Sequence, residues 1–262
     1  MAFKPIDLSA FPPERERGLK ALYRYSRFEL MYYRSNLWMH SWRMLWLVEA
    51  LAPLAEKHLK GVDIEKARTL ALVHDDAEVV FGDVQASARK YMSAEELTQS
   101  EKAEEGAIEQ LSKEYPAEIH GYNYKDLLTS MLRKDTIESQ FVSYVDKFDA
   151  YNESMHDFLA GNISMVESVM FYVQALAFFP SKFPALAEFM SDKTSPLMYL
   201  DDRTWRYHVA AAQYANLVPY TAESVRATTA FPFYDEWKRI VLESGGEEAL
   251  HWLTEQKEYK MA

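Results

Sequence analysis

The chain has 262 residues, 48% of them hydrophobic, so it can bury a sizeable core. Its 40 acidic residues against 29 basic ones give a formal net charge of −11, which disfavours a broad surface for nucleic acid or an anionic membrane. The absence of cysteine excludes disulfides and thiolate zinc sites, so a metal would have to be bound by histidine and carboxylate side chains.

Composition indicates an all-α protein. Only 8 glycines occur, well below the average of about 7%, whereas strong helix formers are plentiful. The N-terminal segment MAFKPIDLSAFPPERERG has no apolar h-region, so we expect no signal peptide, no membrane partner and a cytoplasmic protein. The sequence contains no phosphate-binding loop, dinucleotide fingerprint or serine-hydrolase nucleophile elbow, which disfavours those enzyme classes.

The first predicted elements follow from hydrophobic spacing. Residues 15–34 have spacings compatible with a helix but no clean apolar stripe. A period near 3.6 residues predicts a helix over 40–59. Asp63 is the expected N-cap of the next helix, which we predict to run without a break over 64–81.

The second half of the chain predicts further helices. A strongly charged segment predicts a solvated helix over 94–114, and two more are expected over 124–133 and 136–159. We place a domain boundary after residue 160. Residues 15–160 would form the functional helical bundle, and residues 161–262 a helical extension that packs on this core or forms an oligomer interface.

A cluster of charge closes the predicted helix in the segment LALVHDDAEVVFGD, residues 70–83. His74, Asp75, Asp76 and Glu78 come together there, and a continuous helix would put His74 and Glu78 on one face. Burying that many acids without a counter-charge costs several kcal/mol for each unpaired ion. A divalent cation would remove this cost.

Further ligands for a cation can be found elsewhere in the chain. His40 begins the preceding long helix, and Asp146 lies in the apolar segment FVSYVDKFDAY, with Asp149 as its nearest rival. Two imidazoles and two carboxylates suit Mn²⁺, Co²⁺, Fe²⁺, Zn²⁺ or Mg²⁺ better than Ca²⁺.

The sequence contains a second possible cluster of metal-binding residue types. Its members would be His120, His156, Asp157 and either Asp201 or Asp202. This alternative is disfavoured because His120 lies in a loop between a proline and a glycine, and no apolar helix carries His156.

The order His40, His74-Asp75, Asp146 resembles the signature of the HD-domain metal-dependent phosphohydrolases. More specifically, HDDAEVVFGD is similar to a segment of the bacterial 5'-deoxynucleotidases and their eukaryotic relatives, and HSWRM is similar to the segment that begins with their first metal histidine. The resemblance covers roughly residues 15–160. It implies an HD-domain helical bundle with a C-terminal extension.

The resemblance also implies roles for individual residues. Glu78 and Asp83 match two acids beside the reacting groups, and Arg34 matches a phosphate-binding arginine. Met39 departs from the pattern, because many relatives have an acid immediately before the first histidine. The implied ligands of one divalent metal ion are His40, His74, Asp75 and Asp146.

The function implied is hydrolysis of a small phosphate ester, most simply a nucleoside 5'-monophosphate, by a metal-activated water. Other HD-type substrates, such as a nucleoside triphosphate or an alarmone, are an alternative within the same enzyme class. A non-enzymatic regulatory or scaffolding role for the fold is an alternative from another class. We also expect a homodimer that binds no nucleic acid.

Overall fold

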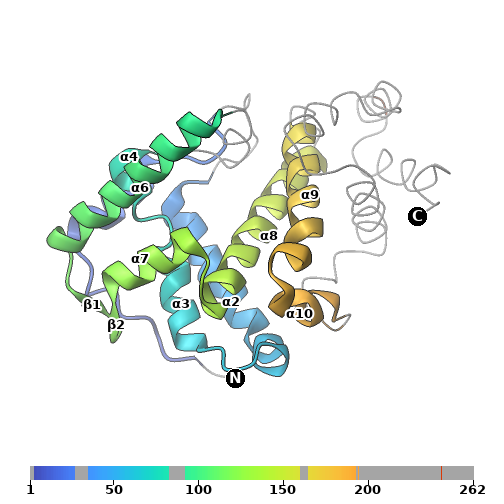
Figure 1. Cartoon of the computed structure of the whole chain (residues 1–262), viewed down its shortest axis with the longest axis horizontal. Helices are drawn as coiled ribbons and strands as arrows, with labels where there is room; N and C mark the ends of the chain where they lie inside the picture. Colours follow the sequence, from blue (N-terminus) through green and yellow to red (C-terminus); the bar gives the residue numbers. More distant parts are fainter. Residues whose placement is uncertain are drawn as a thin grey trace. The chain divides into compact units, whose positions relative to one another are not determined.

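The computed structural model describes residues 3–26, 35–82, 92–159 and 165–192, together with residues 194 and 243. Within this part of the chain, the secondary structure is helical apart from a short hairpin and one isolated bridge (Figure 1). The all-α prediction is therefore confirmed. The backbone divides into two compact units, residues 1–26 with 34–146 and residues 27–33 with 147–262.

The first unit contains most of the described helices. They are α1 (Pro13–Ala21), α2 (Leu37–His58), α3 (Ile64–Val73), α4 (Glu78–Phe81), α6 (Ala94–Glu114), α7 (Tyr124–Arg133) and the first part of α8 (Ile137–Leu159). The second unit contains the rest of α8, then α9 (Val166–Lys182), the short 3₁₀ helix η2 (Pro184–Leu186) and α10 (Ala187–Ser191). Helices α9, η2 and α10 contact one another.

Helices α2 and α3 form the centre of the first unit. They pack side by side, α1 contacts α2, and α7 contacts α3 (Figure 1). Most of the apolar face that the 3.6-residue period predicts for α2 is buried, as expected for an amphipathic helix, but Trp46, which belongs to the same pattern, is 61% exposed. The buried apolar side chains of the two helices include Met44, Leu45, Val48, Leu51, Leu70, Ala71, Leu72 and Val73.

Several hydrogen bonds of Asp63 fix the start of α3. As predicted, Asp63 is the N-cap, and its carboxylate accepts from the Lys66 amide at 3.0 Å. Its other oxygen accepts from the Tyr122 hydroxyl at 2.9 Å, and its own amide donates to Glu138 at 3.0 Å. Asp63 therefore joins α3 to the hairpin and to α8.

The helix predicted without a break over 64–81 is interrupted. α3 ends one residue before His74, and α4 begins at Glu78. Between them, the Asp76 amide donates to the Val73 carbonyl at 2.9 Å, a bond that spans three residues instead of four and tightens the chain. The carboxylate of Asp76 is buried at this point and bonds to other helices, which a periodicity rule does not register.

The hairpin was not predicted. Strands β1 (Glu118–Ile119) and β2 (Tyr122–Asn123) pair antiparallel, with Glu118 opposite Asn123. The two connecting residues, His120 and Gly121, have φ values of 51° and 84°, the left-handed backbone that a two-residue hairpin turn requires. In the sequence, this turn was indicated by the glycine that follows His120.

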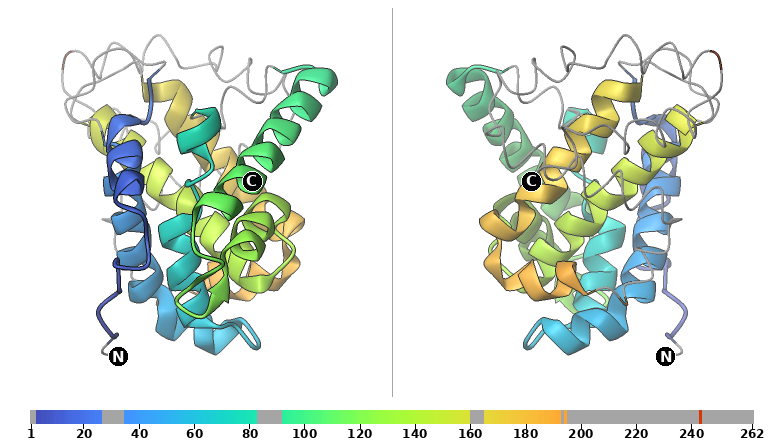
Figure 2. Two further views of the ribbon diagram at one scale, coloured as in Figure 1. Left: turned by 90° about the vertical axis from the view of Figure 1, so that its left-hand side faces the viewer. Right: turned by 90° about the vertical axis from the view of Figure 1, so that its right-hand side faces the viewer.

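The charged helix α6 agrees with its prediction in bounds and exposure. Ser93 and Glu96 form a capping box at its start. Its first turns are exposed, and only Ala107, Ile108 and Leu111 are buried, near the end that contacts α7. In the side views, α6 extends away from the other helices of the first unit (Figure 2).

The predicted extension, residues 161–262, is described over 165–192 and at residues 194 and 243. The boundary after residue 160 stays a prediction. Within the described residues, every helix is too short or too polar to span a bilayer.

We expect Asp63→Ala to lower the free energy of unfolding by about 1–2 kcal/mol, because it removes the cap of α3 and a hydrogen bond from Tyr122. Asp63→Asn keeps a capping oxygen and should cost less. Tyr122→Phe removes only the hydroxyl and serves as the control. Urea unfolding followed by circular dichroism measures all three, and equal stabilities for Asp63→Ala and wild type would contradict the expectation.

Candidate metal centre

Two imidazoles meet where α2 and α3 pack together. His40 lies on the first turn of α2 and is fully buried, and His74 is the C-cap of α3. Their Nε2 atoms are 3.0 Å apart, and their rings are in edge-to-face contact. Nδ1 of His74 lies 2.9 Å from the Ala71 carbonyl, which only accepts, so this nitrogen carries the proton and Nε2 keeps its lone pair.

Two carboxylates complete the cluster. Asp75 lies 3.2 Å from Nε2 of His74 and 3.5 Å from Nε2 of His40, and Asp146 from α8 lies 3.4 Å from Nε2 of His40. The ligand atoms of His40, His74 and Asp146 all lie within 4.8 Å of one another. The sequence-predicted set His40, His74, Asp75 and Asp146 is therefore brought together, and its donor types fit one divalent transition-metal ion.

Burial also prepares His74 to bind a metal. Its side chain is only 3% exposed. Burial lowers the pKa of His74 below its usual value, and His40 acts in the same direction, while the charges of Asp75 and Asp146 oppose the shift. The imidazole is therefore neutral near pH 7, which is the form that coordinates metals.

Arg24 is a site residue that sequence reasoning missed. Its guanidinium contacts Nδ1 of His40, and Nη2 lies 3.8 Å from Asp146. Backbone pairing brings it there: the Arg24 amide donates to the Ser35 carbonyl at 3.0 Å, next to an antiparallel bridge between Tyr23 and Asn36. No local pattern in the sequence predicts this pairing.

The remaining predicted residues have different outcomes. Glu78 begins α4, its amide donates to the Asp75 carbonyl at 3.0 Å, and its Oε2 is buried. Arg34 and Asp83 lie outside the described residues, so their roles stay predictions. Met39, the departure from the family pattern, is 41% exposed, and it is Arg24 that contacts Nδ1 of His40.

The alternatives to this cluster are not favoured. Asp146, and not its rival Asp149, belongs to the group of described residues whose ligand atoms are close enough to hold a metal ion. In the second assembly, Asp201, Asp202 and the side chain of His156 lie outside the described residues. His120 instead holds the N-terminal segment, because its Nε2 lies 2.7 Å from the Asp7 carbonyl.

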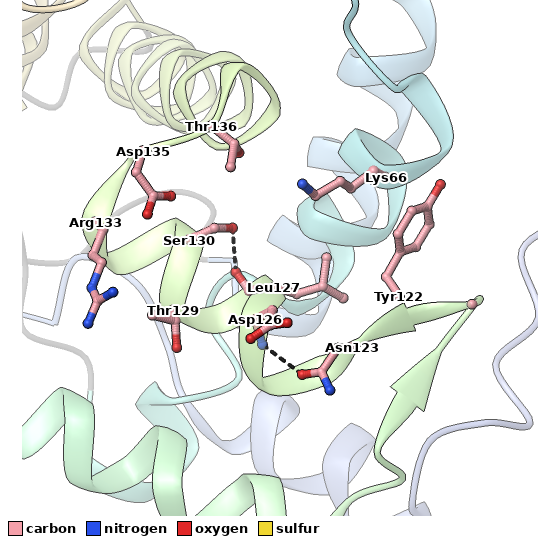
Figure 3. Close-up of a pocket in the computed structure, with 11 residues that line it drawn as sticks. Lys66, Tyr122, Asn123, Asp126, Leu127, Thr129, Ser130, Arg133, Asp135 and Thr136 are labelled. Carbon is pink, nitrogen blue, oxygen red and sulfur yellow. Dashed lines mark hydrogen bonds between the residues drawn. The ribbon is translucent and has the colours of Figure 1, made fainter.

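A separate cavity of about 580 Å³ lies between the start of α3, the hairpin, α7 and the start of α8 (Figure 3). None of its lining residues belongs to the predicted site. Several of its polar groups serve the local fold: Ser130 donates to the Leu127 carbonyl, Asn123 caps α7, and Lys66 lies 3.4 Å from Glu138. We assign no ligand to it.

Comparison with solved structures defines the fold class. The chain is similar to a conserved hypothetical protein from Pyrococcus furiosus, with 24% identity, a TM-score of 0.52, and coverage of 68% of this chain and 94% of the other. It is also similar to an HD-domain phosphohydrolase from Listeria innocua, with 20% identity, a TM-score of 0.55, and coverage of 71% and 89%. The protein therefore has an HD-domain helical fold.

The sequence identifies the family within that class. Residues 17–194 match the profile of the family described as 5'-deoxynucleotidase YfbR-like. The chain belongs to this family. The matched region runs past residue 160, through α9 and α10.

Curated relatives carry the same description. The chain is 28% identical over 128 residues to a 5'-deoxynucleotidase of Vibrio vulnificus (strain YJ016), an alignment that covers 48% of this chain and 64% of the relative. A 5'-deoxynucleotidase of Pectobacterium atrosepticum is 29% identical over 128 residues, with coverage of 48% and 63%. The match thus spans less than two thirds of these relatives' length.

We expect the protein to bind one Mn²⁺ ion and to lose this binding in His74→Ala and Asp146→Ala, because each variant removes a ligand from the cluster. Asp149→Asn, three residues along α8, should bind Mn²⁺ as the wild type does. Isothermal titration calorimetry of the metal-stripped proteins measures the affinities. Loss of binding in Asp149→Asn with retention in Asp146→Ala would make Asp149 the ligand.

Proposed function

We propose that this protein is a metal-dependent phosphohydrolase that releases inorganic phosphate from a nucleoside 5'-monophosphate. The observation that carries the proposal is the convergence of His40, His74, Asp75 and Asp146 on one point. Membership of the 5'-deoxynucleotidase family supports the choice of a nucleotide as the substrate class.

These four residues would hold one ion of Mn²⁺, Co²⁺, Fe²⁺, Zn²⁺ or Mg²⁺. When bound, such an ion supplies Lewis-acid chemistry and lowers the pKa of a coordinated water toward about 7. The carboxylates of Asp75 and Asp146 offset the positive charge of the ion. Because the side chains of His40 and His74 are at most 3% exposed, little solvent can compete for their nitrogens.

Hydrolysis of a phosphate monoester requires two proton transfers. The attacking water loses a proton as its oxygen bonds to phosphorus, and the leaving alkoxide gains one as the P–O bond to the sugar breaks. Glu78 is proposed as the group that accepts the first proton, since its backbone is hydrogen-bonded to that of the ligand Asp75. Asp83 stays the predicted partner of the leaving group or the sugar.

Arg24 is proposed as the phosphate-binding cation, the role that sequence analysis assigned to Arg34. A guanidinium can donate two parallel hydrogen bonds to phosphoryl oxygens, and it would stabilise the charge that spreads over them in the transition state. Its contacts to His40 and Asp146 place it at the edge of the ligand cluster. The homodimer, the cytoplasmic location and the role of residues 161–262 stay predictions.

We expect phosphate release from nucleoside 5'-monophosphates by the protein reloaded with Mn²⁺, Co²⁺ or Mg²⁺, and none after chelation. Ribo- and deoxyribonucleoside mono- and triphosphates are compared by a colorimetric phosphate assay. Glu78→Gln should lower kcat by about 10²–10⁴-fold because it removes the proton acceptor, while its Mn²⁺ affinity is unchanged. Glu101→Gln on the exposed face of α6 is the matched control.

Two outcomes would contradict this function. Hydrolysis of triphosphates alone would indicate another HD-type substrate. A protein that binds Mn²⁺ but releases phosphate from no ester in the panel would favour a regulatory or scaffolding role.

The assignment of the phosphate-binding cation is tested by Arg24→Gln, which we expect to lower kcat/KM by about 10²–10³-fold through the loss of a donor to the phosphoryl group. Inhibition by inorganic phosphate should weaken in parallel. Arg17→Gln, on the exposed side of α1, is the matched control. If Arg34→Gln shows the effect and Arg24→Gln does not, the sequence-based assignment is right and ours is wrong.

A further inference from the structure

Asp76 directly follows the HD pair and has a different environment. Asp75 lies beside the two imidazoles with 16% of its side chain exposed, whereas the side chain of Asp76 is fully buried. Nε and Nη2 of Arg15 each lie 2.8 Å from Oδ1 of Asp76, and the Tyr124 hydroxyl donates to Oδ2 at 3.0 Å. Arg15 comes from α1 and Tyr124 from α7.

Arg15 also bonds to the end of α3. Its Nη2 donates to the Leu72 carbonyl at 2.5 Å, and its guanidinium stacks on the Phe11 ring at 4.1 Å. Arg15 therefore holds the chain on both sides of His74, at Leu72 and at Asp76. A planar guanidinium with several donors in fixed directions suits such a double attachment.

α1 contacts the same region at a second place, one turn further along. A Cβ atom at Gly18 would lie 2.5 Å from Cγ1 of Val79, so the α1 backbone packs directly against the residue that follows Glu78. In the sequence, the contacts of α1 at Asp76 and Val79 lie on either side of Glu78. The contacts of Arg15 at Leu72 and Asp76 lie on either side of the HD pair.

We propose that Arg15, Asp76 and Tyr124 form a positioning network, which sets the direction of the 74–78 turn so that Asp75 and His74 face the metal centre. The turn is held by hydrogen bonds that span three residues and not by a continuous helix, and anchoring Asp76 in the core restricts where the side chain of the adjacent Asp75 can point. The part of this inference that concerns turnover rests on the proposed function; the part that concerns metal affinity does not.

Stability alone is a weak reason for such a network. A buried ion pair loses much of its attraction to desolvation, and apolar side chains of similar volume often give equal or greater stability. Burial raises the pKa of Asp76 even with Arg15 and Tyr124 bound to it, which reflects this cost. In contrast, removing a residue that orients a metal ligand without binding the metal itself typically lowers metal affinity or activity by about 10–100-fold.

The test compares Arg15→Met and Tyr124→Phe with Arg68→Met. Arg68 is a buried arginine on α3 that pairs with the partly exposed Glu49 at 2.6 Å, but it lies six residues before His74, and none of its hydrogen-bond or ion-pair partners is a predicted ligand. Mn²⁺ affinity is measured by calorimetry, the symmetry of the bound Mn²⁺ by electron paramagnetic resonance, and folding by circular dichroism and urea unfolding.

We expect Arg15→Met to weaken Mn²⁺ binding by about 10–100-fold and to change the Mn²⁺ spectrum, with a smaller effect in Tyr124→Phe. Arg68→Met should bind Mn²⁺ as the wild type does, even where it unfolds at lower urea. Phosphate release, measured at saturating Mn²⁺, should fall in Arg15→Met beyond what its metal occupancy explains, because Glu78 lies on the same turn.

Unchanged Mn²⁺ affinity and spectrum in folded Arg15→Met and Tyr124→Phe would overturn the inference and leave the network a structural one. The same conclusion would follow if Arg68→Met weakened binding as much as Arg15→Met. If Arg15→Met does not fold, Tyr124→Phe alone decides, since it removes one hydroxyl. Absence of phosphate release by a wild type that binds Mn²⁺ contradicts the proposed function, and the affinities still test the network.

Discussion

A carboxylate that leaves water needs polar partners in place of it, and two adjacent carboxylates of this chain have different ones. Asp76 is buried against Arg15 from α1, and Asp75 faces two imidazoles and Asp146. Because the backbone is shared, the direction of one side chain constrains the other. The break between α3 and α4, the packing of α1 and the direction of the HD pair all depend on this arrangement.

The candidate metal centre combines residues from distant parts of the sequence because of how α2 and α3 pack. His40 lies at the start of α2 and His74 at the end of α3, and the contact between the two helices brings these ends together. Asp146 comes from the first half of α8. A site assembled on rigid helices keeps its ligands within a narrow range of positions, which metal coordination requires.

Positive charge near the cluster comes from arginines on the N-terminal segment. The chain has a net charge of −11, so an anionic substrate would be repelled without local cations. Arg24 lies beside His40 and Asp146 and is 8% exposed. Arg15 is only 1% exposed and bonded to Asp76, so it is not available to bind a substrate directly.

The elements that sequence predicted well depend on local chemistry. The N-cap at Asp63, the charged helix α6 and the bounds of α7 follow from capping and periodicity, which act over a few residues. The continuous helix over 64–81 was wrong because the interaction that breaks it joins Asp76 to residues 61 and 48 positions away in the sequence.

The residues of the candidate site also differ in whether local sequence could predict them. The candidate ligands His40, His74-Asp75 and Asp146 could be predicted from sequence, because metal binding requires those residue types and their order resembles the signature of a known family. Arg24 had no such signal, because its position depends on backbone pairing between residues 22–24 and 35–37.

The sequence by itself therefore determined the helical class and the family, and it predicted the candidate metal ligands that the structure brings together. The tertiary structure decided which way Asp75 and Asp76 face and which arginine lies at the metal centre. The physical reason is that helix formation depends on neighbours in the chain, whereas the pairing of buried charge depends on neighbours in space.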